Sequence, residues 1–305
     1  MWIKTFEEYR KSDWVDSDGK KIEYKGRADK ISLEKAVDLY KKNCSDWDLK
    51  NEKKIYRGLW INSDYFYTNP KGKYRSSANA DNTYNSLFDV LKSWEKAPKR
   101  SESLIMTNDL TGAESFGDVY VMIPYNGTKI GICSKCDVWN SMTFMESIIA
   151  GEYYGMDSLD SELSSLFKQI TKGKPEYKHL IKSNSWEDYK GETVTRHYLS
   201  VNNKTIVELC EIVDSIPKDQ LPTNYGFSDE ELMIVKIWIN KFPNMKFLEF
   251  MEHILDFNKN GMKVVNNQTD LLKSTGNCNE MWSSGEFIGI DEDEYDEFVK
   301  LIYNT

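Results

Sequence analysis

Three short motifs carry the side chains of this chain that are best suited to chemistry. Arg57 lies in the run I-Y-R-G-L-W, Ser101 and Ser103 begin the run S-E-S-L-I-M-T, and Glu286 lies in G-E-F-I-G-I near the C-terminus. An arginine fork binds a phosphate with two parallel hydrogen bonds, and a fixed carboxylate stabilises positive charge that develops beside it. The motifs therefore predict a site for a phosphate-bearing ligand, provided that the fold brings them together.

The elements that must position these residues are short strands near the middle of the chain. Residues 55–61 alternate and are rich in strand formers, which predicts a strand that carries Arg57. The pair Asn126-Gly127 is a strong turn signal between two apolar runs. Further strands are expected at 103–107, 119–124, 128–133, 193–201 and 285–290. The last strand must return to the early sheet if Glu286 is to meet Arg57.

Helical periodicity surrounds this β-rich centre. Ser32 is placed to cap a helix, although Lys35 stands where a complete capping box has a glutamate. Other helices are expected at 81–94, over most of 138–265, and at 295–303. We therefore predict an α+β fold. Its parts are an N-terminal helical segment at 1–50, a core made of 51–140 and 270–305, and a mainly helical insertion at 141–269 that helps to choose the target.

The composition is that of an ordinary globular chain of 305 residues, with 40 % hydrophobic and 29 % charged residues. The N-terminus is charged, and no run approaches the roughly 20 apolar residues of a membrane helix. We therefore expect no secretion signal and no membrane partner. The net charge of −9 disfavours a general nucleic-acid binder. A local basic groove is still compatible with that charge; its members would be Lys71, Lys73, Arg75, Lys99 and Arg100.

Cysteine usage predicts a reducing compartment. The five cysteines are odd in number and scattered, which argues against a disulfide framework and favours a cytoplasmic protein. Cys133 and Cys136 have C-x-x-C spacing, but a zinc site would need a second pair or a nearby histidine. The three histidines show no ligand spacing, so no metal is expected. The chain has no G-x-G-x-x-G, Walker A or H-E-x-x-H motif, which leaves Rossmann, P-loop and zincin interpretations without support.

An arginine flanked by apolar residues, an S-x-S at the head of a strand and a glutamate that opens a late strand occur here in that order. This order resembles the R-S-E class of mono-ADP-ribosyltransferases, which split NAD and move its ADP-ribose to a target. The resemblance covers about 52–140 and 277–290. It implies a split β-sheet core, to which the N-terminal helices and the helical insertion are added.

The resemblance assigns roles to the residues of the three motifs. Arg57 would hold the pyrophosphate of NAD, and the backbone of Gly58 would grip the nicotinamide amide, since a glycine permits close approach. Ser101 would orient the catalytic carboxylate of Glu286, and Ser103 would complete the cofactor-binding element. Glu286 would bond a hydroxyl of the nicotinamide ribose and stabilise the oxocarbenium ion. A competing interpretation makes Arg57, Gly58 and Glu286 ordinary residues of strands.

Neighbouring residues receive lesser roles. Phe116 and Tyr120 follow the S-x-S strand and would stack on nicotinamide, although both would equally suit a core. Glu280, Trp282 and Ser284 lie on the loop before Glu286 and would contact the target. Ser284 stands where arginine-modifying members carry Glu or Gln, so acceptors other than arginine stay open.

The expected activity is transfer of ADP-ribose from NAD, the co-substrate, to a protein or an RNA, with release of nicotinamide. The resemblance implies a toxin, a phage-defence effector or a phage-borne modifier, with an inhibitor or antitoxin protein as a further partner. Two alternatives stay open. One is an NAD glycohydrolase that uses water at the same site, and the other is a non-catalytic interaction protein with an ADP-ribosyltransferase-like fold.

Overall fold

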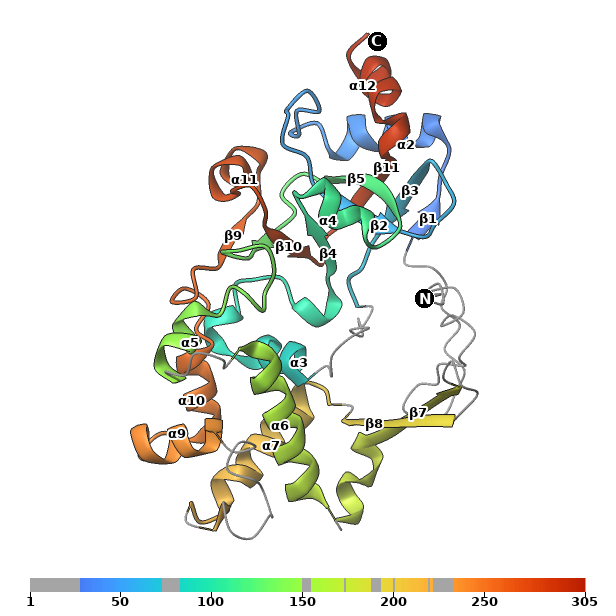
Figure 1. Cartoon of the computed structure of the whole chain (residues 1–305). Helices are drawn as coiled ribbons and strands as arrows, with labels where there is room; N and C mark the ends of the chain where they lie inside the picture. Colours follow the sequence, from blue (N-terminus) through green and yellow to red (C-terminus); the bar gives the residue numbers. More distant parts are fainter. Residues whose placement is uncertain are drawn as a thin grey trace.

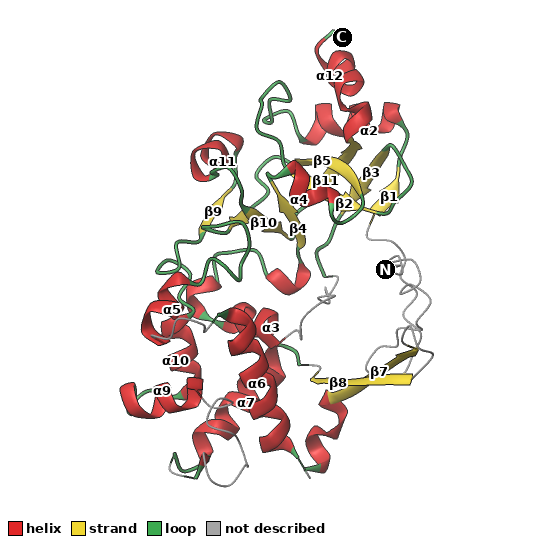
Figure 2. Ribbon diagram, in the orientation of Figure 1, coloured by secondary structure: helices red, strands yellow, loops and turns green. Residues whose placement is uncertain are grey.

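The computed structural model describes residues 28–72, 83–149, 155–172, 174–187, 193–199, 201–218, 220–221 and 233–304. An antiparallel sheet lies at the middle of the molecule (Figure 1). Two helices cover it on one side and a helical unit lies on the other, as the colouring of Figure 2 shows. The chain is therefore α+β, as the sequence predicts.

Nine strands form this sheet in the described part of the chain, in the order β1-β3-β11-β5-β2-β4-β10-β6-β9. The strands are β1 (Ala28–Lys30), β2 (Tyr56–Leu59), β3 (Tyr65–Thr68), β4 (Leu104–Thr107), β5 (Asp118–Pro124), β6 (Ile130–Ile132), β9 (Lys263–Val265), β10 (Glu280–Ser283) and β11 (Phe287–Asp291). The predicted strands around Arg57, after Ser103 and after Glu286 are therefore confirmed.

A long antiparallel ribbon divides the sheet into two halves. Its first half pairs β11 with β5, and its second half pairs β10 with β6. Only the short links 125–129 and 284–286 separate the halves. The first half has β3 and β2 as outer neighbours, whereas the second half has β4 and β9. Within the described strands, β2 meets β4 at one residue pair, Tyr56 and Thr107, so the sheet is split beside β2.

The turn at Asn126-Gly127 is present, and Gly127 has the positive φ of 76° that favours glycine there. The strands on either side of it, β5 and β6, nevertheless take other partners. The reason is that β10 and β11 arrive from the far end of the sequence and pair with both of them.

One hydrophobic core lies between the sheet and two helices, α2 (Leu33–Asn43) and α12 (Tyr295–Tyr303). Ser32 caps α2 as predicted, by accepting a hydrogen bond from the backbone of Lys35. The ring of Phe298 packs on Tyr40 and Tyr65, with centroids 6.0 and 6.3 Å apart. Since β1 joins the sheet edge, the described part of the predicted N-terminal segment belongs to the core and is not a separate unit.

The second core lies in the helical unit below the sheet. Its helices are α3 (Thr83–Val90), α5 (Thr143–Ile149), α6 (Met156–Thr171), α7 (Asn203–Ser215), α9 (Met233–Lys241) and α10 (Phe247–Ile254). Two boundaries of the predicted insertion are therefore wrong. Helix α3 was expected in the transferase-like core but packs with α6 and α7, and β9, inside the predicted insertion, forms the edge of the sheet.

The predicted strand at 193–201 is confirmed as β8 (Thr193–Leu199), which pairs with β7 (Ile181–Glu187) in a sheet of its own. Two short helices lie next to strands of the nine-stranded sheet. Helix α4 (Leu110–Glu114) packs against β2, and α11 (Gln268–Ser274) lies beside β9. Among the described residues, the structure contains no helix that is long and apolar enough to cross a membrane.

Candidate functional site

The structure does not bring Glu286 and Arg57 together. Arg57 lies opposite Tyr120 on β5, whereas the backbone of Glu286 bonds Tyr125 at the other end of that strand. These two positions are about 17 Å apart along β5. Tyr120 also pairs with Asp291, five residues after Glu286, so the alternation of side chains puts Glu286 on the opposite face of the sheet. The Glu286 carboxylate instead accepts a hydrogen bond from Asn69, 3.1 Å away.

The hydroxyls of the S-x-S motif are occupied in fastening a turn. Ser101 lies in the 3₁₀ turn Arg100–Glu102 and donates a hydrogen bond to Asp89 of α3. Burial raises the pKa of Asp89, and the bond from Ser101 opposes that rise. Ser103 donates to the carbonyl oxygen of Lys99, 2.6 Å away. Both serines are buried, and these bonds hold the turn to α3 and not to Glu286.

Gly58 and Tyr120 have structural reasons for their identities. A Cβ on Gly58 would come within 2.0 Å of the carbonyl oxygen of Ala113, so glycine lets α4 pack directly on β2. Tyr120 is 1 % exposed, and its ring packs edge-on against Phe66. Burial raises the pKa of Tyr120 to about 12. Tyr120 is therefore a core residue, which corrects the expectation that it stacks on a ligand.

The loop residues expected to touch a target also differ from prediction. Trp282 is fully buried, donates a hydrogen bond to the carbonyl oxygen of Pro98 at 2.8 Å and packs against Trp94. It belongs to the helical unit's core, which corrects the prediction of a target contact. Ser284 is half-buried in the link between β10 and β11.

A different set of residues meets at the split in the sheet. Thr107, at the end of β4, lies opposite Tyr56 of β2 on one side and opposite Glu280 of β10 on the other. Arg57 follows Tyr56, so its Cα lies about 10 Å from that of Glu280, two strand spacings away, although side-chain alternation directs Arg57 to the face opposite to that of the paired row. Directly paired side chains have Cβ atoms about 5 Å apart. The Thr107 hydroxyl accepts a hydrogen bond from the backbone N–H of Asp109, 3.0 Å away, and a hydroxyl that accepts one hydrogen bond can still donate another.

Two exposed aromatic rings flank Arg57. Phe116 is 58 % exposed, and the guanidinium of Arg57 lies 5.8 Å from its ring centre. Trp60 is 50 % exposed and lies against Gly117, the residue after Phe116. Large apolar side chains are normally buried. A half-buried arginine against one exposed flat ring, with a second exposed ring beside the neighbouring Gly117, therefore suits a ligand that has both a phosphate and an aromatic ring.

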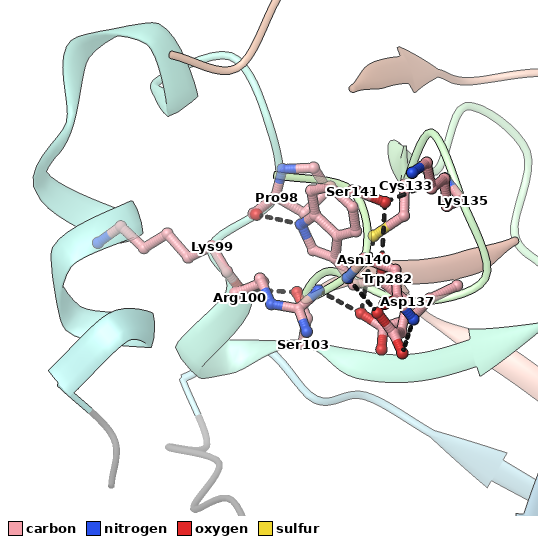
Figure 3. Close-up of polar contacts among 11 residues, drawn as sticks. Pro98, Lys99, Arg100, Ser103, Cys133, Lys135, Asp137, Asn140, Ser141 and Trp282 are labelled. Atoms are coloured by element: carbon pink, nitrogen blue, oxygen red, sulfur yellow. Dashed lines mark hydrogen bonds and ion pairs between the residues drawn. The ribbon is translucent and has the colours of Figure 1, made fainter. Parts of the chain in front are cut away.

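Glu280 contacts Arg100 and Cys133, which Figure 3 shows together with Trp282 in a cluster of polar contacts. Its Oε1 is 2.6 Å from Nη1 of Arg100, and the two side chains are 16 % and 2 % exposed. Burial by itself lowers the pKa of Arg100, but the Glu280 carboxylate raises this pKa above its ordinary value. Cys133 lies 3.8 Å from the same carboxylate oxygen. Burial and Glu280 raise the pKa of the Cys133 thiol, which keeps it protonated.

The loop before Glu280 is fastened at several points. Asn279 receives a hydrogen bond from Gly276, donates its backbone N–H to Asn108 and donates its side chain to the carbonyl oxygen of Cys133. A disulfide joins Cys136 to Cys278, across 142 residues of sequence. The sequence predicted no disulfide framework; the structure has this one disulfide, and Cys44, Cys133 and Cys210 are free. Of the two cysteines in the C-x-x-C motif, Cys133 is a buried free thiol, and Cys136 forms the disulfide with Cys278.

Sequence reasoning placed Glu280 among the target-binding residues and missed Thr107 and Arg100. One signal was present in the sequence. Apolar residues follow Glu280 directly, in E-M-W, as they follow Glu286 in E-F-I-G-I. Arg100 was expected in an exposed basic groove, and its burial removes it from that groove. Lys71 and Lys99 are exposed, whereas Lys73 and Arg75 lie outside the described residues.

No protein-family model, curated protein or solved structure matches this chain. The described residues contain no group of three or more His, Cys, Asp or Glu side chains arranged to hold a metal ion.

Proposed function

We propose that the chain is an NAD-dependent mono-ADP-ribosyltransferase in which Glu280, not Glu286, supplies the catalytic carboxylate. The observation that carries the proposal is the row of paired residues at the split in the sheet. It consists of Tyr56, Thr107 and Glu280 on three adjacent strands, β2, β4 and β10, and Arg57 follows Tyr56 on β2, about 10 Å from Glu280 between Cα atoms. Arg57, Thr107 and Glu280 supply the three side-chain types of the R-S-E class, in the same order along the chain, with Thr107 in the place of the serine.

Each residue then has a role that follows from its position. Arg57 binds the pyrophosphate, and Phe116 and Trp60 offer flat surfaces for the rings of the dinucleotide. The bond between the ribose C1′ and the nicotinamide nitrogen breaks, and its electron pair leaves with neutral nicotinamide. Glu280 stabilises the positive charge left on the ribose, while Thr107 orients the carboxylate. A nucleophilic atom of the target then bonds to C1′ and loses its proton to the solvent.

The acceptor is a macromolecule, protein or RNA, in this proposal. The net charge of −9 and the loss of Arg100 from the basic groove favour a protein slightly. The proposed setting stays that of a toxin, a phage-defence effector or a phage-borne modifier, which an inhibitor or antitoxin protein would control. A cytoplasmic localisation stays the proposal: Cys44, Cys133 and Cys210 are free thiols, which favours it, whereas the disulfide between Cys136 and Cys278 counts against it.

One observation favours the non-catalytic alternative. The ion pair with Arg100 occupies one oxygen of the Glu280 carboxylate, and a buried pair of this kind is also found as a purely structural contact. An interaction protein that keeps the fold would release no nicotinamide, and an NAD glycohydrolase would release nicotinamide without labelling any polymer.

The test compares two glutamates that lie six residues apart. The purified protein is incubated with labelled NAD and a cell lysate, and nicotinamide release and the label on protein and RNA are measured. We expect Glu280→Gln to lower turnover roughly 10²–10³-fold, as loss of one electrostatic contact to the transition state commonly does. Glu286→Gln is the matched control and should keep wild-type turnover.

Circular dichroism of each variant separates loss of activity from loss of fold. Arg57→Lys, which keeps the charge but not the fork, should raise the KM for NAD in a folded protein. Loss of turnover in Glu286→Gln but not in Glu280→Gln would return the catalytic role to Glu286. A wild-type protein that releases no nicotinamide would refute the function itself.

A further inference from the structure

We infer that Arg100 is a positioning residue, whose guanidinium pairs with the carboxylate of Glu280 and holds it in the orientation that the reaction requires. The inference rests on the proposed function. Nothing in the R-S-E order points to Arg100, because it lies between the S-x-S serine and Pro98 in a segment expected to be an exposed basic surface.

The backbone around Arg100 is fixed from both sides. Its turn is closed by hydrogen bonds from Glu102 to Lys99 and from Ser103 to Arg100, and Ser101 ties the turn to Asp89 on α3. This gives the S-x-S serines a defined task, since they determine where the guanidinium lies. Figure 3 shows Lys99 pointing away from the cluster while Arg100 points toward Trp282.

The guanidinium itself has little freedom to move. It lies 5.3 Å from the ring centre of Trp282, which is fully buried and bonded to the carbonyl oxygen of Pro98. Trp282 and Glu280 are two residues apart on β10, so their side chains share one face of the strand. Arg100 therefore reaches along that face, over the tryptophan, to the carboxylate of Glu280.

The charges around Glu280 assign the electrostatic role to Arg100. Its own strand and β4 bring no cation to the described contacts of the carboxylate. The loop after β6 contributes Cys133, which is protonated, and Asp137, which is negative, while α3 contributes Tyr84 on the side of Arg100. Burial disfavours a charged carboxylate, and the ion pair with Arg100 offsets that cost. The pair engages Oε1, which leaves Oε2 as the oxygen that would contact the substrate in this proposal.

The inference predicts a specific change in the pH profile of turnover. In Arg100→Met the buried Glu280 takes up a proton more readily, so the acidic limb of kcat against pH should move to higher pH. We expect kcat at neutral pH to fall about 10²-fold, the usual result of misplacing a reacting group, while the KM for NAD changes little. Arg100→Lys keeps the charge and should restore the position of the acidic limb, with only part of kcat.

A second measurement does not depend on turnover. With glutamate labelled with ¹³C at the carboxyl group, the Glu280 resonance is assigned by its absence in Glu280→Gln and titrated in both Arg100 variants. The midpoint should rise by at least about one pH unit in Arg100→Met and stay near the wild-type value in Arg100→Lys. An unchanged midpoint, or a uniform loss of kcat without movement of the acidic limb, would overturn the role of Arg100. Absence of nicotinamide release by the wild-type protein would instead refute the proposed function. The titration would still test whether Arg100 sets the titration midpoint of Glu280.

Discussion

Removing one partner of the Arg100–Glu280 ion pair should destabilise the protein far more than removing both. Arg100 is 2 % exposed and Glu280 is 16 % exposed, so neither charge regains much water when its partner is lost. Breaking a buried pair from one side typically costs about 3–5 kcal/mol, whereas replacing both partners with neutral groups is often nearly neutral. We therefore expect about 3–5 kcal/mol for Arg100→Met and a loss of similar sign for Glu280→Gln.

The double variant Arg100→Met/Glu280→Gln should lose less than the sum of the two single variants, with a coupling free energy of about 2 kcal/mol or more. Urea unfolding measures these quantities. Trp282 lies against Arg100, and Trp94 packs on Trp282, so tryptophan fluorescence contains a signal from the region that the substitutions disturb.

The exposed pair Lys204–Glu208 provides the matched control. Its side chains are 87 % and 43 % exposed and 3.7 Å apart, so Glu208→Gln should change the free energy of unfolding by no more than about 0.5 kcal/mol. If the Arg100 and Glu280 single variants add within about 0.5 kcal/mol, the two charges are not coupled and the reasoning on this cluster fails.

Three further predictions follow from single positions. Gly58→Ala should cost about 1–3 kcal/mol in urea unfolding, because a Cβ would lie 2.0 Å from the Ala113 oxygen and force α4 off the sheet; wild-type stability would show that α4 moves freely. Burial raises the pKa of Asp89, so its protonated form is favoured in the folded state, and the stability that it contributes is present below its ordinary pKa and declines as pH rises through the raised value. The melting temperature measured between pH 3 and 7 should therefore fall less with rising pH in Asp89→Asn than in the wild-type protein. An identical pH dependence in the two proteins would contradict this. Phe116→Ala should raise the KM for NAD about 2–10-fold without changing the melting temperature, since Phe116 is 58 % exposed; an unchanged KM would remove its ring from the binding surface.

Local physical chemistry was enough to predict most of the elements. The serine cap at Ser32, the turn at Asn126-Gly127 and the strand that carries Arg57 each depend on a few neighbouring residues. Capping, backbone preference and side-chain alternation act within that range. The α+β class followed from the same short-range signals.

The partners of each strand could not be predicted in this way. The strands β5 and β6 flank a strong turn signal, yet they pair with β11 and β10 from the other end of the chain. The disulfide between Cys136 and Cys278 likewise joins residues 142 positions apart. Such contacts depend on which apolar surfaces bury one another in the whole fold. The spacing of residues along the sequence does not indicate which surfaces will meet.

The candidate site shows the same division. The sequence by itself determined that an arginine, hydroxyls and two late glutamates were present in a suggestive order, and it determined the strand around Arg57. Only the tertiary structure decided between Glu280 and Glu286, because the two lie on different halves of one bent ribbon. Pairing through Thr107 brings Glu280 within two strands of Arg57, about 10 Å between Cα atoms, whereas Glu286 lies about 17 Å from Arg57 along β5. A bend of three residues between β10 and β11 therefore decides which carboxylate is a candidate for catalysis.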